Sequence, residues 1–287
     1  MSSAGEAVAV RCAVWGSPVA HSLSPVLHAA AYDALGLAGW EYGRADVDEA
    51  GLPAALAALD GSWRGLSLTM PLKRAVIGLL DSVSPVAEAA GAVNTVLLCD
   101  GRRTGDNTDV PGITAAVRER VGDVRSAVVV GGGATAASSL LGLADVGCER
   151  VTLVVRDPAR AERTVAVAAE HGGVEVAVAS LADVSGLRET SADLLVGTVP
   201  GAAWTPDLLA ATAHVPAVFE MVYDGWPTPL AAAAGTDRVL VSPLDLLVHQ
   251  AVRQVQLMTG LPLEVVEPAL APMRDAGEVA LRERPAG

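Results

Sequence analysis

A β-branched run that ends in three consecutive glycines constrains the fold of this chain more than any other segment. The segment reads SAVVVGGGATAASSLLGLADVG over residues 126–147, so that an alanine-rich stretch follows the glycines. A buried strand, a glycine turn and a helix in this order are typical of a dinucleotide-binding unit, where backbone N–H groups and the helix dipole hold a pyrophosphate. We expect the cofactor to contact the turn residues Gly131, Gly132, Gly133, Ala134 and Thr135.

A second strand and a charged turn follow at the distance that such a unit requires. Val151–Val155 is apolar and β-branched, and it runs into Arg156, Asp157 and, three residues further, Arg160. Asp157 could accept a hydrogen bond from a ribose 2′-hydroxyl, as in NAD sites, whereas the two arginines could bind the 2′-phosphate of NADP. Two arginines against one aspartate favour NADP, and NAD remains the alternative.

Further short strands are expected in the second half of the chain, at Val174–Val178, Leu194–Val199 and Val215–Glu220. The turns after such strands are where open α/β sheets bind their ligands. The turn residues that we expect to contact the cofactor are Thr198, Val199 and Met221. Because 287 residues exceed the usual size of one domain, the expected fold class is α/β with two domains.

Lys73 is the only lysine in the chain, since the other 19 basic side chains are arginines. Arginine keeps its proton near neutral pH, whereas a lysine ammonium can be tuned to release one. We expect Gly65–Thr69 to form a short buried strand and Pro71 to open a helix whose first turn carries Lys73. A lone lysine at this place is a candidate proton-transfer group, and a chance surface lysine is the alternative.

Two serines, Ser22 and Ser24, precede the first expected helix. Ser24-Pro25 is a good helix start, with serine as the N-cap and proline at the first helical position. Two hydroxyls beside unpaired backbone N–H groups can hold a carboxylate or a phosphate. Plain N-capping explains Ser24 equally well.

Polar side chains crowd into the loop GDNTDVPG at residues 105–112. Asp106, Asn107 and Asp109 precede an expected helix, so Asx turns and capping account for this segment when it is taken alone. Alanines and leucines at helical intervals predict two more helices, over 46–59 and over Pro243–Thr259, the second of which carries Gln250.

Composition excludes several functional classes. The formal net charge of −13 argues against a nucleic-acid partner, because phosphate binding relies on basic patches. No apolar run reaches the roughly 20 residues that a membrane span needs. The three cysteines offer neither a disulfide framework nor metal-ligand spacing, so no metal site is expected. The first residues, MSSAGEAVAVRC, do not read as a signal peptide, and the expected location is the cytoplasm.

Together these segments resemble the shikimate dehydrogenase family from about Val10 to about Leu261. The stretches that carry the likeness are SPVAHSLSP at 17–25, LSLTMPLK at 66–73, GAVNT at 91–95, DNTD at 106–109, the glycine turn at 131–133, YDGWPTPL at 223–230 and HQA at 249–251. A single motif of this kind is weak, but all of them in this order are specific to the family.

The resemblance implies a role for each matched residue. Lys73 and Asp109 would form the catalytic pair, and Ser22 and Ser24 would hold the substrate carboxylate. The ring hydroxyls would be bound by Thr69, Asn94, Asp109 and Gln250, with Ser67 as a further substrate contact in the place of a usual asparagine. Tyr223 would lie near the nicotinamide and the carboxylate.

The resemblance also implies the domain organisation and the reaction. A substrate domain over 1–110 would be followed by an NADP-binding Rossmann domain over 111–239, and the helices of 240–287 would pack back on the substrate domain. The expected reaction is the reversible NADPH-dependent reduction of 3-dehydroshikimate to shikimate, in aromatic amino acid and chorismate biosynthesis. The protein would act as a monomer or a homodimer.

Several departures from the family pattern leave alternatives open. Ser67 shortens one polar side chain, Val155-Arg156-Asp157 stands where the family has Asn-Arg-Thr, and Pro243 and Asp245 replace glycines that approach the nicotinamide. One alternative is a dehydrogenase of quinate or of an aminated shikimate analogue that uses NAD or NADP. A non-catalytic metabolite-binding regulator with the same fold is the other.

Overall fold

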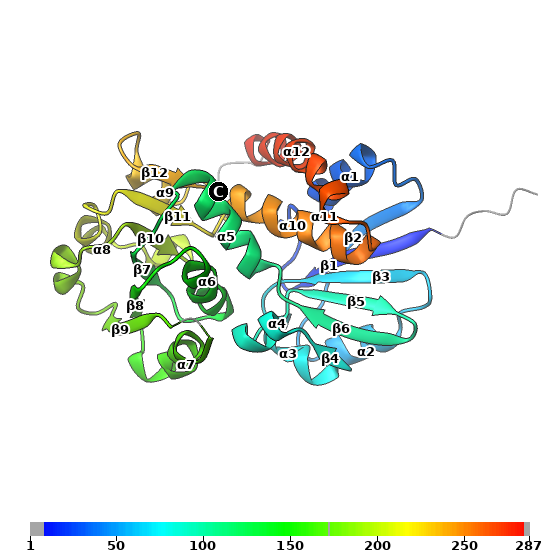
Figure 1. The fold of residues 1–287 in the computed structure, drawn as a ribbon, viewed down its shortest axis with the longest axis horizontal. Helices are drawn as coiled ribbons and strands as arrows, with labels where there is room; N and C mark the ends of the chain where they lie inside the picture. Colours follow the sequence, from blue (N-terminus) through cyan, green and yellow to red (C-terminus); the bar gives the residue numbers. More distant parts are fainter. Residues whose placement is uncertain (1–8, 172, 284–287) are drawn as a thin grey trace, which may run out of the picture. The chain divides into compact units, whose positions relative to one another are not determined.

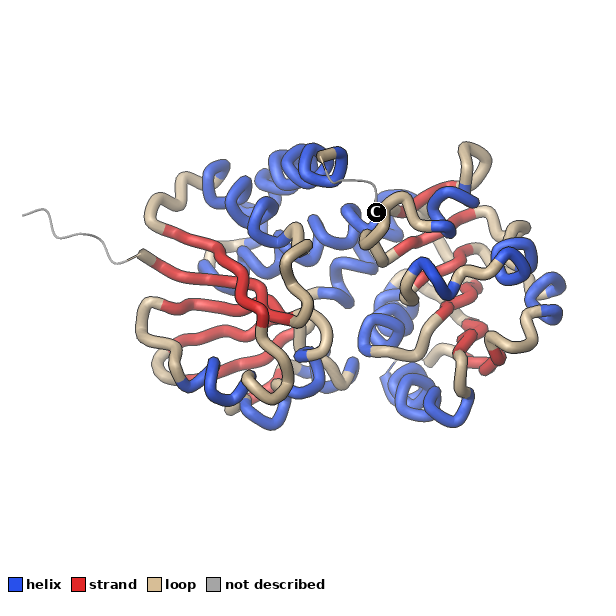
Figure 2. Tube along the Cα trace, turned by 180° about the vertical axis from the view of Figure 1, so that it is seen from behind, coloured by secondary structure: helices blue, strands red, loops and turns tan. Residues whose placement is uncertain are grey.

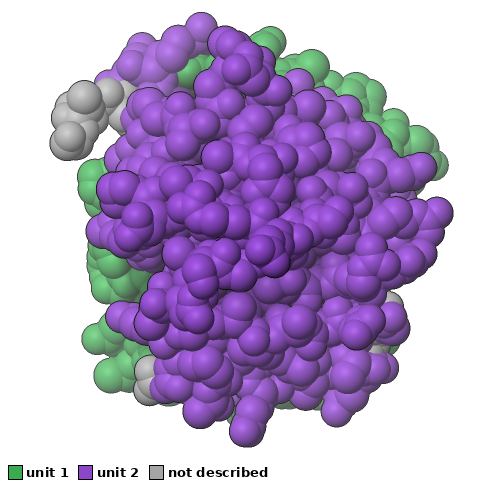
Figure 3. Space-filling model, turned by 90° about the vertical axis from the view of Figure 1, so that its left-hand side faces the viewer, with its two compact units in different colours: residues 1–88, 92–108, 251–280 green, residues 89–91, 109–250, 281–287 purple. Residues whose placement is uncertain are grey.

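The computed structural model describes residues 9–171 and 173–283 of the chain. It divides into two compact units, which Figure 3 colours separately. The first holds the chain up to Glu88, Ala92–Thr108 and Ala251–Ala280, and the second holds Ala89–Gly91, Asp109–Gln250 and the chain from Leu281 on. The domain boundaries expected from the sequence stay a prediction. The prediction that the first residues are not a signal peptide concerns a segment of which residues 1–8 lie outside the described part of the structure.

The first unit is built on a six-stranded mixed sheet, with strand order β2-β1-β3-β5-β6-β4 in the described part of the chain (Figure 1). Its strands are β1 (Val10–Gly16), β2 (Trp40–Asp46), β3 (Trp63–Leu68), β4 (Ser82–Val83), β5 (Thr95–Cys99) and β6 (Arg102–Asp106). β1 pairs in parallel with β2 and β3, whereas β5 runs antiparallel to β3 and to β6. The carboxyl ends of β1, β3 and β6 therefore meet the start of β5 at one edge of the sheet.

Helices cover both faces of this sheet (Figures 1 and 2). They are α1 (Ser24–Ala34), α2 (Leu52–Ala57), α3 (Leu72–Ala75), α4 (Pro85–Ala90), the second half of α10 (Pro243–Thr259), α11 (Leu263–Val266) and α12 (Leu270–Arg282). Successive residues of a strand point to opposite faces. Leu66 and Leu68 of β3 accordingly join the core under α2 and α3, while Gly65 faces Met258 of α10.

The second unit holds a six-stranded parallel sheet of order β12-β11-β10-β7-β8-β9. Its strands are β7 (Ser126–Val130), β8 (Arg150–Val155), β9 (Glu175–Ser180), β10 (Leu194–Gly197), β11 (Ala217–Glu220) and β12 (Val239–Val241). The chain runs outward from β7 through β8 to β9, and then returns to β10 on the other side of β7. The strand order therefore reverses between β7 and β10, which is where doubly wound sheets bind ligands.

Two apolar clusters lie on the two faces of this sheet, because its strands are hydrophobic on both sides. One cluster joins the sheet to α5 (Asp109–Arg120), α6 (Ala134–Asp145), α7 (Glu162–His171) and the start of α10, and the other joins it to α8 (Pro206–Ala211) and α9 (Pro229–Ala234). Val129 belongs to the first cluster and its neighbours Val128 and Val130 belong to the second. The expected α/β fold class is thereby confirmed.

The sequence-based secondary structure was wrong over 46–59. β2 extends to Asp46, and α2 covers only Leu52–Ala57 between Gly51 and the turn at Asp60-Gly61. The prediction that Pro71 opens a helix whose first turn carries Lys73 is confirmed, because Pro71 is the N-cap of α3, a single turn of four residues. Among the described residues no helix combines the length and the apolar character that crossing a membrane requires.

Candidate active site

Three of the expected site residues come together at the shared edge of the first sheet. The backbone N–H of Thr69 donates to Trp15 O at 2.9 Å, which joins the end of β3 to the end of β1. Leu68 N donates to Asn94 O at 2.7 Å, and Val93 N donates to Lys73 O at 2.7 Å. These bonds bring Thr69, Lys73 and Asn94 to one place, although they come from separate segments of the sequence.

The two serines lie at the start of α1, close to this edge. Ser24 is the first helical residue and Leu23 holds the N-cap position without a side-chain cap, so the expectation that Ser24 caps the helix was wrong. Instead, Ser22 Oγ accepts the backbone N–H of Ser24 at 3.3 Å, and the hydroxyl of Ser24 interacts with that of Tyr42. Both hydroxyls thus have protein partners, and their contact with a substrate carboxylate stays a prediction.

A buried polar network, which the sequence did not suggest, runs beneath Asn94. Tyr42 donates to Ser67 Oγ at 2.5 Å, and Ser67 donates to Gln254 Oε1 of α10 at 2.7 Å. Gln254 Nε2 donates in turn to Thr95 Oγ1 at 3.1 Å, and Thr95 donates to Asn94 Oδ1 at 2.8 Å. Ser67 thus donates its hydrogen bond to Gln254. A direct contact of Ser67 with the substrate stays a prediction.

Asp109 and Gln250 belong to the second unit, and both are buried. Asp109 begins α5, and Gln250 donates its side-chain N–H to Leu247 O at 2.8 Å. α5 and α10 pack closely beside them, because a Cβ on Gly112 would lie 3.0 Å from the backbone nitrogen of Gln250. Since Lys73 is in the other unit, its pairing with Asp109 stays a prediction.

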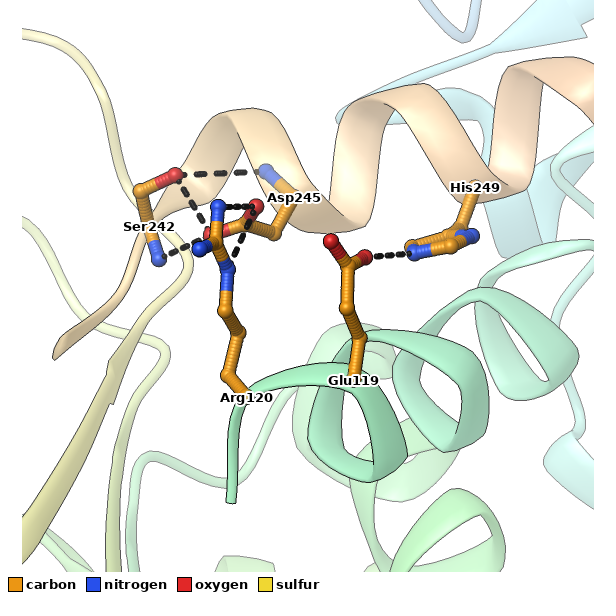
Figure 4. Close-up of polar contacts among 5 residues, drawn as sticks. All are labelled: Glu119, Arg120, Ser242, Asp245 and His249. Carbon is orange, nitrogen blue, oxygen red and sulfur yellow. Dashed lines mark hydrogen bonds and ion pairs between the residues drawn. The ribbon is translucent and has the colours of Figure 1, made fainter. Parts of the chain in front are cut away.

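Two polar contacts join α10 to the last part of α5 (Figure 4). Arg120 donates from Nη2 to Asp245 Oδ1 at 2.8 Å, and His249 meets Glu119 at 2.7 Å. Burial opposes the ionisation of Asp245, yet hydrogen bonds from Arg120 and Ser242 outweigh it and hold the pKa of this carboxyl below its ordinary value. His249 is a packing residue between α5 and α10.

Replacing Asp245 with asparagine is expected to lower the free energy of unfolding by about 1–3 kcal/mol at pH 7. A carboxyl whose pKa is depressed by folding contributes stability above its unfolded pKa and loses it as the pH falls through the folded pKa. The difference between the wild type and Asp245→Asn should therefore shrink below the ordinary pKa of 3.8. Urea unfolding against pH measures it.

Glu149→Gln is the matched control for this variant. It removes an ion pair with Arg125 in which both side chains are more than half exposed. Exposed pairs contribute about 0–1 kcal/mol, so this variant should unfold almost like the wild type. If Asp245→Asn lowers the free energy of unfolding at pH 7 as little as Glu149→Gln does, the Arg120–Asp245 ion pair does not stabilise the fold.

In the second unit, the expected cofactor residues line two hollows at the carboxyl edge of the parallel sheet. Gly131, directly after β7, and Val199, after β10, line a hollow of about 650 Å³. Gly132 and Gly133 line a neighbouring hollow of about 240 Å³ together with Asp157. The larger hollow lies at the reversal of strand order between β7 and β10, and the smaller one lies beside it, between the ends of β7 and β8. The strand, turn and helix are therefore placed as a dinucleotide site requires.

The backbone of this turn is held by two threonines. Thr198 donates from Oγ1 to Val130 O at 2.8 Å, and Thr164 donates from Oγ1 to Gly132 O at 2.9 Å. Gly131 has φ of +123°, and a Cβ built on it would overlap Thr198 Oγ1. Only glycine fits this position. Thr164 is a residue that the sequence did not suggest, because nothing in its helical segment distinguishes it.

Arg156 and Asp157 differ in how they face the hollows. Arg156 is exposed and lines both. Asp157 Oδ1 accepts the backbone N–H of Ala159 at 3.1 Å, as the N-cap of the short 3₁₀ helix Pro158–Ala161. This carboxylate therefore has a structural partner of its own. The side chain of Arg160 lies outside the described part of the structure.

The loop after β11 is organised by Glu220, a buried carboxylate that the sequence did not single out. Glu220 accepts from the backbone N–H of Val222 at 3.0 Å and from the hydroxyl of Thr228 at 2.6 Å. Burial raises its pKa above the ordinary value, and these hydrogen bonds oppose the rise. Met221 packs beside Ser139 of α6, and Tyr223 is half-buried on the same loop.

The second unit has a glycine turn where the strand order of its parallel sheet reverses. The sheet of the first unit brings a lysine and an asparagine together at one edge. These features define a two-unit protein of the dinucleotide-binding α/β class. Residues 14–96 match the family described as shikimate dehydrogenase substrate binding domain. The chain is 38% identical over 275 residues to the NADP⁺-dependent shikimate dehydrogenase of Methylobacterium radiotolerans, covering 91% of this chain and 94% of that protein.

Solved structures give the same result. The shikimate dehydrogenase of Mycobacterium tuberculosis superposes with a TM-score of 0.83 at 37% identity, over 91% of this chain and 98% of that one. The shikimate 5-dehydrogenase of Thermus thermophilus, solved in complex with NADP(H) and shikimate, gives 0.77 at 31% identity, over 94% and 99%. The chain belongs to the shikimate dehydrogenase family, as its sequence motifs led us to expect.

Proposed function

We propose that this protein is an NADP-dependent oxidoreductase that interconverts shikimate and 3-dehydroshikimate. The observation that carries the proposal is the meeting of Thr69, Lys73 and Asn94 at one sheet edge in a member of this family. NADP is the cofactor named for the relative at 38% identity, and the glycine turn with its two hollows fits such a dinucleotide.

Lys73 is the residue proposed to transfer the proton. The nicotinamide supplies or accepts a hydride, and the ring oxygen must gain or lose a proton as the hydride moves. An ammonium can donate that proton, whereas an arginine would stabilise the oxyanion without readily releasing one. Asp109, the proposed partner of Lys73, would orient the ammonium.

The remaining site residues would bind and orient the two ligands. We assign the substrate carboxylate to Ser22 and Ser24, the ring hydroxyls to Thr69, Asn94, Asp109 and Gln250, and a further substrate contact to Ser67. Tyr223 would approach the nicotinamide and the carboxylate. The cofactor residues are Gly131, Gly132, Gly133, Ala134, Thr135, Arg156, Asp157, Arg160, Thr198, Val199 and Met221.

Arg156 is proposed to select NADP over NAD, since its exposed guanidinium lines both hollows while Asp157 caps a helix. Arg156→Ala should raise the KM for NADP⁺ by at least roughly tenfold through loss of a charge-assisted contact to the 2′-phosphate. The KM for NAD⁺ should stay within about twofold, which is well below the effect of one hydrogen bond. Equal losses with both cofactors would contradict this role.

Initial rates with shikimate or quinate, each with NADP⁺ or NAD⁺, test the proposed function directly. Fast turnover of shikimate with NADP⁺ supports it. A preference for quinate or NAD⁺ would replace it with a related dehydrogenase activity. Tight binding of shikimate without turnover under any of the four conditions would leave a metabolite-binding protein.

We also propose that the protein acts in the cytoplasm as a monomer or a homodimer. Cell fractionation tests the first point, because a biosynthetic enzyme that uses NADPH should follow soluble cytoplasmic markers. Sedimentation equilibrium tests the second, and a larger assembly would contradict it.

A further inference from the structure

A hollow of about 420 Å³ in the first unit is lined by other residues than those proposed to bind the substrate and the cofactor. It lies beside the end of α2, where β3 and β6 begin and β5 ends. Thr69 and Asn94 lie at the other ends of β3 and β5, so the hollow is at the opposite edge of the sheet from the proposed active site. Its volume is within the roughly 300–1,000 Å³ of pockets that bind small molecules.

One side of this hollow is apolar. Leu56 is buried, and Leu59, Leu98 and Trp63 are half-buried and pack against the core of the unit. The ring of Trp63 meets that of Trp15 edge to face, with 6.3 Å between the ring centroids. An indole held in this way offers a fixed surface against which another aromatic ring can pack.

The hollow is also lined by three arginines, Arg64, Arg102 and Arg103, in a chain whose formal net charge is −13. Arg103 Nη2 donates to Leu56 O at 3.3 Å, which brings this guanidinium to the apolar side, and Arg64 Nη1 donates to the backbone oxygen of Gly61 at 3.3 Å. Arg102 is exposed. Within the described part of the chain, none of these three arginines forms an ion pair with an acidic side chain.

The two aspartates of the lining, Asp60 and Asp100, are held by their own turns. Asp60 Oδ1 accepts the backbone N–H of Ser62 at 2.9 Å and also its hydroxyl, and these bonds hold the pKa of the Asp60 carboxyl below its ordinary value. Asp100 Oδ2 accepts from Cys99 Sγ at 3.5 Å in the hairpin turn between β5 and β6. Each arginine carries five N–H donors, so most of the donors around the hollow are left for an anion.

We infer that this hollow binds a small aromatic carboxylate, whose ring packs against Trp63 and whose carboxylate accepts hydrogen bonds from Arg102, with Arg103 adding positive charge. A guanidinium matches a carboxylate with two parallel N–H bonds. An inorganic anion would use the arginines alone and leave the apolar side facing water. The inference goes beyond the proposed function and does not depend on it, because the two sites share no residue.

Titration of the ¹⁵N-labelled protein with phenylacetate tests the inference without any turnover. The chain has five tryptophans and hence five indole N–H signals, of which that of Trp63 is identified by its loss in Trp63→Phe. Excess shikimate is present throughout, so that the proposed substrate site is occupied. The Trp63 signal should shift until it saturates, while the signals of Trp204 and Trp226, which belong to the second unit, stay in place.

Three further probes separate the two parts of the ligand. Phenylacetamide keeps the ring without the charge, whereas acetate and inorganic phosphate keep the charge without the ring. The Kd for phenylacetate should be at least roughly tenfold lower than that for any of the three, the effect of one strong contact. Equal affinity for phosphate or acetate would show that the ring is not recognised, and equal affinity for the amide would show the same of the charge. Either result would overturn the inference.

Arg102→Gln removes the charge at an exposed position and should raise the Kd for phenylacetate at least roughly tenfold, with urea unfolding unchanged. Arg188→Gln is the matched control, because Arg188 is an exposed arginine of the second unit that does not line the hollow. Equal Kd values for the two variants would contradict the proposed contact with Arg102.

An activity assay identifies the competing explanation. If phenylacetate competes with shikimate but leaves the Trp63 signal unmoved in the titration, it binds at the proposed substrate site and the inference about the hollow is wrong. If the protein fails to oxidise shikimate, the proposed function is lost, and the Trp63 shift still decides whether the hollow binds an aromatic carboxylate.

Discussion

Lys73→Ala is expected to reduce the rate of shikimate oxidation roughly 10³-fold, the middle of the range for a lost general acid–base group. The loss should fall on kcat, since the substrate contacts assigned to Thr69 and Asn94 remain in place. Lys73 O accepts a backbone hydrogen bond from Val93, which no side-chain substitution removes, so the sheet edge should keep its structure. Steady-state rates and circular dichroism measure the two effects.

Lys73→Arg decides between proton transfer and charge alone. This substitution keeps a positive charge at the site, but the guanidinium of arginine does not release its proton near neutral pH. We expect a kcat almost as low as that of Lys73→Ala. A kcat close to the wild type would show that the positive charge suffices and would remove Lys73 from proton transfer. Arg64→Ala, at an exposed residue of β3, is the control for the loss of a cation.

Gly131→Ala is expected to lower the affinity for NADP⁺ by at least roughly hundredfold and the free energy of unfolding by about 2–4 kcal/mol, from steric overlap and an unfavourable φ. The new methyl group would overlap Thr198 Oγ1 at φ of +123°. Moving Thr198 would break its hydrogen bond to Val130 and deform the hollow between β7 and β10. Fluorescence titration with NADPH and urea unfolding measure these losses.

Gly147→Ala is the matched control. Gly147 also has a positive φ, of +87°, but a Cβ there would meet nothing within 4 Å and would lie away from both hollows. It should cost about 1 kcal/mol of stability through backbone strain alone and leave NADP⁺ affinity unchanged. If the two variants bind NADP⁺ equally well, the assignment of the cofactor to the hollow at Gly131 is wrong.

The cofactor-binding unit could be predicted because its signals are local. The strand, the glycine turn and the start of α6 are contiguous, and continuous β-branched runs mark strands that are buried on both faces. The segment 46–59 was misjudged for the opposite reason. β2 has no continuous apolar run, and alanine and leucine in α2 suit a helix of any length.

The network beneath Asn94 could not be predicted from the sequence. Its members, at positions 42, 67, 95 and 254, are brought together by strand pairing and by the packing of α10. Each residue alone is an ordinary polar side chain, and only burial shows that their hydrogen bonds must be mutually satisfied. Gln254 is one helical turn from Gln250, but only the fold shows that it faces Ser67.

The pleat of β3 separates two kinds of constraint on neighbouring residues. Leu66 and Leu68 fill the core under α2 and α3, whereas Ser67 between them belongs to the polar network. A substitution at Ser67 therefore disturbs buried hydrogen bonds, whereas a smaller side chain at Leu66 or Leu68 leaves a cavity in the core, so two adjacent positions of one strand are constrained by different physical effects.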